Sequence, residues 1–120
     1  MIRPLATAAL LSALLASTAS AQGETWVAVA SDGAGLWGVG VGMATREAAE
    51  ASAIGQCGVY CRLKFTALAN CVAYAFSDTG RAEGFGAAPT QQAASQQAWS
   101  ECNANVPANS CTVRTAQCFQ

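Results

Sequence analysis

The sequence contains no histidine. Histidine is the commonest general base and metal ligand near neutral pH, so its absence excludes Ser-His-Asp and Cys-His hydrolase sites. The cysteines form no C-x-x-C pair, which argues against a zinc site and against a thiol oxidoreductase. We therefore expect no bound metal and no cofactor.

Charge is also scarce, because Asp, Glu, Lys and Arg together make up only 11% of the residues. The basic residues are scattered along the chain and form no stripe that could follow a phosphate backbone, so nucleic acid is not an expected partner. No cationic amphipathic stretch suited to a membrane surface is present either.

The single long apolar run lies at the N-terminus, over residues 5–16. It follows Arg3 and precedes the small residues 19–21, which together predict a signal peptide at 1–21, cleaved after Ala21. Its twelve residues fall short of the ~20 that a spanning helix needs. We expect a mature domain at 22–120 with no membrane span, in the periplasm or secreted.

All six cysteines lie in the mature part, and a domain this small buries a limited core. An even number of cysteines in a short exported chain predicts three disulfides. The predicted disulfide cysteines are Cys57, Cys61, Cys71, Cys102, Cys111 and Cys118.

The mature chain is an internal repeat. Residues 27–57 align without a gap on residues 72–102, with nine identities that include Thr45/Thr90, Ala49/Ala94 and Cys57/Cys102. We expect two tandem, pseudo-symmetric β-β-α-β units, about 26–70 and 71–118, in one disulfide-stapled α+β domain. Exchange symmetry favours pairings that map onto themselves. We expect Cys57–Cys61 and Cys102–Cys111, each linking a helix end to its following strand, with Cys71–Cys118 joining the copies. Cys57–Cys102 with Cys61–Cys71 and Cys111–Cys118 has the same symmetry.

In each unit, a hairpin precedes a helix and a final strand. The predicted strands are 26–30, 36–43 and 61–65 in the first copy, and 71–76, 82–86 and 111–115 in the second. Thr45 and Thr90 are predicted N-caps of helices that end at Cys57 and Cys102. The predicted packing stripes are Ala49, Ala53, Ile54 and Cys57, and Ala94, Ala98, Trp99 and Cys102.

Alternating glycines at 38, 40 and 42 predict that one strand face is pressed closely by a backbone, by the helix or by a ligand. Asp32 and Asp78 stand in the hairpin turns, where aspartate usually caps the turn. The alternative is a carboxylate pair for glycoside hydrolysis drawn from Asp32, Asp78 and Glu83.

Most of the large aromatic side chains are expected in the core. Exposed ones would mark a partner or glycan site. Trp37, in the glycine-rich strand, and Tyr60, beside the short loop after the first helix, are the candidate binding residues.

The order of alanines and cysteines across both copies resembles the DUF4189 family of small exported bacterial proteins. The resemblance covers nearly all of the mature chain. It rests on Ala28, Val29, Ala30, Trp37, Gly38, Ala49, Ala53, Cys57, Cys61, Cys71, Ala73, Ala75, Ala94, Ala98, Cys102, Cys111 and Cys118. The resemblance implies no common activity, so it carries over no catalytic residue.

The leading hypothesis is a non-enzymatic interaction module whose partner is an envelope or host protein. It follows from the lack of a catalytic constellation and from the small stapled scaffold. The alternatives are a carbohydrate-active or cell-wall enzyme using a carboxylate pair, and a structural envelope protein.

Overall fold

The computed structural model describes residues 25–106 and 109–119, so the expected signal peptide lies outside the described residues. The chain forms two β-β-α-β units, which confirms the predicted α+β class. The elements are β1 (Trp26–Ser31), β2 (Trp37–Met43), α2 (Arg46–Cys57) and β3 (Arg62–Leu68), then β4 (Cys71–Phe76), β5 (Glu83–Ala88), α3 (Gln91–Asn103) and β6 (Thr112–Cys118).

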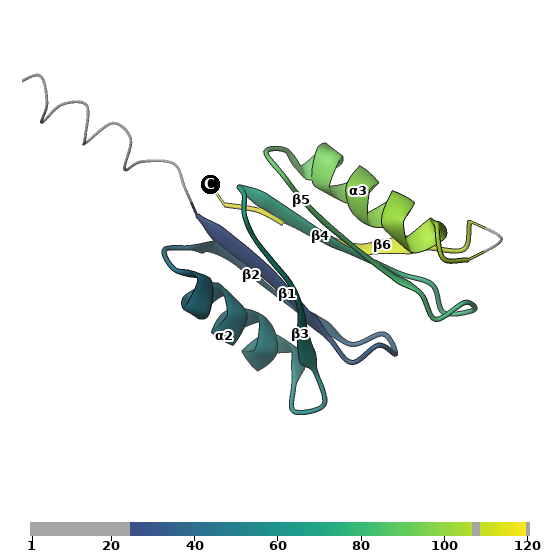
Figure 1. The fold of residues 1–120 in the computed structure, drawn as a ribbon, viewed down its shortest axis with the longest axis horizontal. Helices are drawn as coiled ribbons and strands as arrows, with labels where there is room; N and C mark the ends of the chain where they lie inside the picture. The colour runs from purple at the N-terminus through teal and green to yellow at the C-terminus, as the bar shows by residue number, and fades with distance from the viewer. Residues whose placement is uncertain (1–24, 107–108, 120) are drawn as a thin grey trace, which may run out of the picture.

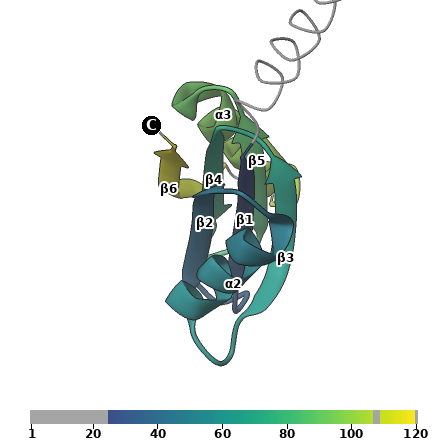
Figure 2. The ribbon, with the colours of Figure 1, turned by 90° about the vertical axis from the view of Figure 1, so that its left-hand side faces the viewer.

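Each unit is a three-stranded antiparallel sheet with one helix on its outer face. The strand orders are β2-β1-β3 and β5-β4-β6, so the first strand of each unit is central. The two sheets face each other and the helices lie outside them, in four layers (Figures 1 and 2). Sheet-on-sheet packing thus joins the two copies.

The core between the sheets holds the bulky side chains. Val27 and Val29 of β1 meet Val72, Tyr74 and Phe76 of β4 there, all at most 2% exposed. The cores between each sheet and its helix consist mainly of alanine and cysteine. Small side chains let each helix approach its sheet closely, while the large ones fill the wider space between the sheets.

Both helices begin as predicted. The hydroxyl of Thr45 accepts a hydrogen bond from the Ala48 amide at 3.1 Å, and Thr90 accepts one from Ala93 at 3.2 Å. The predicted packing stripes need one correction in each copy, because Ile54 and Trp99 are 40% and 41% exposed. The helices pack so closely, through alanine and cysteine, that the larger side chains remain at the solvent boundary.

The helix explains two of the three alternating glycines, Gly38 and Gly40. A Cβ on Gly40 would stand 2.3 Å from the Ala49 carbonyl oxygen, and one on Gly86 would stand 2.0 Å from that of Ala94. Real Cβ atoms do not approach a carbonyl so closely, so only glycine admits the helix backbone at these positions. The predicted close approach by the helix is thus confirmed at Gly38 and Gly40, whereas Gly42 lies against the Phe119 ring.

The ungapped alignment of the copies fails in the hairpins. Ala28 pairs with Gly40 and Ala73 with Gly86, so the offset is 45 residues in the first strands but 46 in the second. The turn between Phe76 and Glu83 is one residue longer than the turn between Ser31 and Trp37, which shifts the offset to 46. β2 in turn has a bulge between the pairs Trp26/Met43 and Ala28/Gly40, where Gly42 has a φ of +70°. This extra residue restores the offset of 45 before the helices.

The disulfides are Cys57–Cys61, Cys71–Cys118 and Cys102–Cys111. They match the first of the two symmetric arrangements, with one correction. Cys71 and Cys118 are register partners on β4 and β6. Their bond therefore bridges two neighbouring strands of the second sheet and does not join the copies. The fold has no need of a covalent link between the copies, because the core between the sheets joins them.

We expect the disulfides to differ in their contribution to stability. The Cys71–Cys118 bond spans 47 residues and the Cys57–Cys61 bond spans 4. Loop-closure entropy then predicts about 4 kcal/mol for the first and about 2 kcal/mol for the second. Urea unfolding of the two paired Cys→Ala variants measures this difference, and equal losses would contradict it.

Candidate functional site

The most exposed apolar side chains lie in the short loop between α2 and β3. Val59 is 91% exposed and Tyr60 is 83% exposed. The loop is closed by the Cys57–Cys61 bond, and the Gly58 amide donates to the Ile54 carbonyl at 3.0 Å. Both apolar side chains therefore project from a constrained backbone. Less conformational entropy is then lost when a partner binds the loop.

Two more exposed apolar residues lie beside this loop. Ile54, in the last turns of α2, is 40% exposed, and Leu63 of β3 is 37% exposed. The Thr66 hydroxyl donates to Glu50 at 3.1 Å, which places this side of α2 over β3. Ile54 follows Glu50 by one helical turn and therefore lies toward Leu63. We call Ile54, Val59, Tyr60 and Leu63 the Tyr60 patch.

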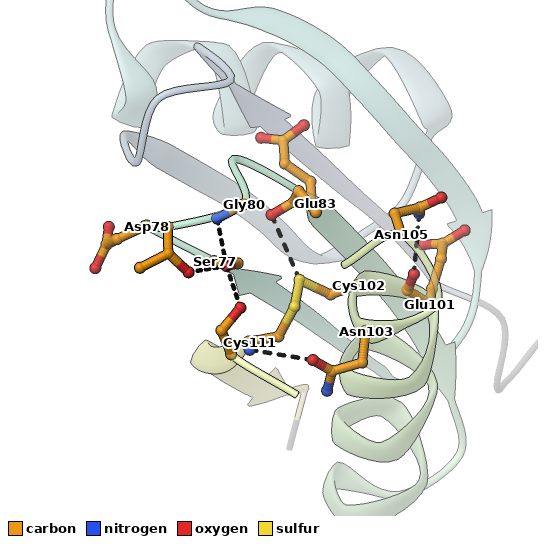
Figure 3. Close-up of a disulfide and its surroundings, with 12 residues drawn as sticks. Ser77, Asp78, Gly80, Glu83, Glu101, Cys102, Asn103, Asn105 and Cys111 are labelled. Carbon is orange, nitrogen blue, oxygen red and sulfur yellow. Dashed lines mark hydrogen bonds between the residues drawn. A yellow bond between two sulfur atoms is a disulfide. The ribbon is translucent and has the colours of Figure 1, made fainter. Parts of the chain in front are cut away.

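The corresponding loop of the second copy turns an apolar side chain inward. This loop, between α3 and β6, is longer, and Val106 from that loop is buried against Gly80. The Asn103 side chain accepts a hydrogen bond from the Cys111 amide at 3.1 Å, beside the Cys102–Cys111 bond (Figure 3). Val106 thus joins the buried core of the second copy, whereas Val59 and Tyr60 of the shorter first loop are exposed.

The two candidate binding residues differ in their exposure to solvent. Tyr60 is exposed, whereas Trp37 is half-buried against the core between the sheets. Trp99 of α3 is more exposed than its place in the predicted stripe suggested.

The three candidate carboxylates have different surroundings. Asp32 Oδ1 accepts from the amides of Ala34 at 2.8 Å and Leu36 at 3.0 Å, which caps the first hairpin turn as predicted. Asp78 instead pairs with Arg114 at 3.1 Å. The corresponding turn contact comes from the Ser77 hydroxyl, which accepts from the Gly80 amide at 3.0 Å. The side chains of Asp78 and Glu83 point in different directions (Figure 3).

The amides of Ala34 and Leu36 hold the pKa of Asp32 below its ordinary value of 3.8. This capping therefore stabilises the fold fully above the unfolded-state pKa and is lost as the pH falls through the folded-state pKa. Asp32→Ala should lower the thermal midpoint at neutral pH and leave it unchanged at pH values below both pKa values. Melting curves across that range test this; a constant difference at every pH would contradict the capping role.

Glu83 is the centre of a polar cluster between the sheets. Its Oε2 accepts from the Tyr74 hydroxyl at 2.7 Å and from the Ser31 hydroxyl, and its Oε1 lies 3.7 Å from Lys64 Nζ. Ser31 and Lys64 belong to the first copy, Tyr74 and Glu83 to the second. The cluster therefore links the two copies through two buried hydroxyl groups and one largely buried carboxylate, with Lys64 at its exposed side.

Burial, followed by the hydrogen bond to Glu83, raises the pKa of Tyr74 far above its ordinary value of 10.0. The phenol is thereby kept as a donor to the carboxylate. The sequence does not predict this cluster of Ser31, Lys64 and Tyr74 around Glu83, because the contacts that unite them cross between the two sheets. A polar Ser31 at the end of an apolar run was the one local signal.

A shallow hollow of about 340 Å³ lies where β3 leads into β4, lined by Leu68, Ala69, Asn70, Ala87, Ala88 and Pro89. It contains no charged side chain. Across residues 25–106 and 109–119, no cluster of three or more Cys, Asp or Glu side chains could hold a metal ion. None of the described helices has the length and apolar character needed to cross a membrane.

The chain was compared with protein families, curated proteins and solved structures. No curated protein and no solved structure matches it. The model of DUF4189, a domain of unknown function, matches residues 26–118, which include both units and all six cysteines. The chain therefore belongs to the DUF4189 family.

Proposed function

We propose that this chain is an exported, non-enzymatic interaction module that binds a partner protein through the Tyr60 patch. The observation that carries the proposal is the exposure of Val59 and Tyr60, 91% and 83%, on a loop closed by a disulfide. Tyrosine in a rigid exposed setting contributes strongly to protein interfaces, because it adds contact area at small entropic cost. Three disulfides are compatible with a compartment outside the cytoplasm.

The contacts of the three candidate carboxylates favour a binding role for the protein over glycoside hydrolysis. Asp32 is occupied by amides of its own turn, Asp78 by Arg114, and Glu83 by Ser31, Tyr74 and Lys64. Each carboxylate thus has a structural partner, and hydrolysis would require two carboxyl groups facing one substrate.

The test is capture of a partner. Oxidised chain from 22 to 120 is immobilised and offered periplasmic, culture-medium and host-cell extracts, with a reduced and alkylated sample as control. We expect one protein to be retained stoichiometrically by the oxidised form alone. No retention would contradict the proposal, and so would turnover of peptidoglycan or a glycan that is lost in Glu83→Gln.

A further inference from the structure

The two sheets leave four edge strands, namely β2, β3, β5 and β6. The outward N–H and C=O groups of an edge strand need water, a side chain or another strand as hydrogen-bond partner. How each edge is covered therefore shows where a further strand could be added.

Helix side chains cover part of three edges. On β2, the Val39 amide donates to Gln56 at 3.2 Å. On β5, the amides of Phe85 and Ala87 donate to Glu101 at 2.6 Å and to Gln97 at 3.0 Å. On β6, the Ala116 carbonyl accepts from Gln91 at 2.7 Å. Each of these bonds occupies a backbone group that an added strand would use.

The edge of β3 lacks the corresponding cover. Thr66 pairs with Ala28 as Ala116 pairs with Ala73, so its outward carbonyl is the counterpart of the one bound by Gln91. The residue at the position of Gln91 in the first copy is Arg46, whose guanidinium lies 5.2 Å from the centre of the Trp26 ring. In the described part of the chain, no side chain bonds an outward backbone group of β3.

The side chains along this edge favour an apolar neighbour. Leu63 and Leu68 of β3 are 37% and 50% exposed. Edge strands are commonly shielded by lysine. Here Lys64 is turned toward the other sheet, where it pairs with Glu83 at 3.7 Å.

We propose that β3 accepts an extended segment of the partner protein as a fourth strand of the first sheet. This rests on the proposed function, because β3 starts directly after the loop that carries Tyr60. The backbone of the added segment bonds Thr66 and Leu68, whose peptide groups point outward, and its alternate apolar side chains contact Leu63 and Leu68. Binding by strand addition obtains affinity from the backbone and specificity from alternate side chains.

The probe is a set of linear peptides selected from a random displayed library on the oxidised chain from 22 to 120. We expect a bound peptide to slow hydrogen exchange at the amides of Thr66 and Leu68. Thr66→Pro removes an outward donor without removing a bond to β1, and should weaken binding at least about tenfold. Ala116→Pro makes the same backbone change on β6 and should leave binding unchanged. Thr66→Ala, which removes only the hydroxyl that donates to Glu50, should also leave it unchanged.

A second test needs no variant of the protein. Methylating alternate backbone nitrogens of the peptide should abolish binding in one of the two registers only, because only alternate amides face β3. Peptides that bind without protecting Thr66 and Leu68 would overturn the proposal, as would selection of no peptide. Slow hydrogen exchange at these amides in the free chain, caused by self-association, would assign the edge to a second copy. That result would also overturn the proposal.

The two proposals fail differently. Binding that is lost in Tyr60→Ala but unchanged in Thr66→Pro would overturn strand addition and retain the Tyr60 patch. Binding that is lost in Thr66→Pro but unchanged in Tyr60→Ala would support the edge and contradict the patch.

Discussion

Gly86→Ala is expected to destabilise the protein by about 3 kcal/mol or more, at the upper end of overpacking substitutions. The added Cβ would stand 2.0 Å from the Ala94 carbonyl oxygen and 3.0 Å from the Ala98 amide nitrogen, so α3 must move away from the sheet. That movement would loosen a core in which Ala94, Ala98 and Cys102 are fully buried. Urea unfolding with the disulfides intact measures the loss.

Gly55→Ala is the matched control. Gly55 lies inside α2, and a Cβ there would meet nothing within 4 Å. Alanine is the better helix former, so this variant should gain about 0.5 to 1 kcal/mol. A cost at Gly55, or no cost at Gly86, would contradict the close approach of helix and sheet.

Glu83→Ala is expected to cost about 2 to 4 kcal/mol, because it leaves two buried hydroxyl groups without their acceptor. Those groups belong to Tyr74 and Ser31, both fully buried. Glu83→Gln keeps an acceptor oxygen and loses the charge near Lys64, so a smaller loss is expected. The free energy of unfolding is again the measurement.

A double-mutant cycle separates this effect from general disruption. In a Tyr74→Phe background, Glu83→Ala should cost less than in the wild type, because one of the two orphaned hydroxyl groups is already absent. Equal costs in both backgrounds would contradict a structural bond between Glu83 and Tyr74.

Sequence patterns predicted the parts of the fold that depend on nearby residues. Thr45 and Thr90 cap their helices through contacts three residues away, and the repeat extends that pattern to both copies. The short Cys57–Cys61 and Cys102–Cys111 bonds likewise link a helix end to the following strand. Such local constraints leave a direct trace in residue spacing.

Contacts between the two sheets left no such trace. Glu83 meets Ser31 from 52 positions away, which no spacing rule within one unit predicts. The stacking of the copies likewise decides that Trp37 is half-buried against the inter-sheet core. Tyr60 could be chosen from the sequence as a candidate binding residue, because it stands in a short loop between two cysteines. A loop this short has little room to turn its side chains inward.

The bulge at Gly42 escaped prediction for a different reason. An extra residue in β2 and a longer turn in the second hairpin cancel before the helices, so the ungapped alignment looked continuous. Pairing register in the sheets is needed to see both changes.

The most direct test of the account is the affinity of the captured partner for three forms of the oxidised chain: wild type, Tyr60→Ala and Trp99→Ala. Trp99 is the matched control, since it is an exposed aromatic residue on the helix of the other copy. We expect Tyr60→Ala to weaken binding by about 2 kcal/mol or more, the loss typical of an interface anchor, and Trp99→Ala to leave it unchanged. Unchanged binding in Tyr60→Ala, or an equal loss in both variants, would contradict the assignment of binding to the Tyr60 patch.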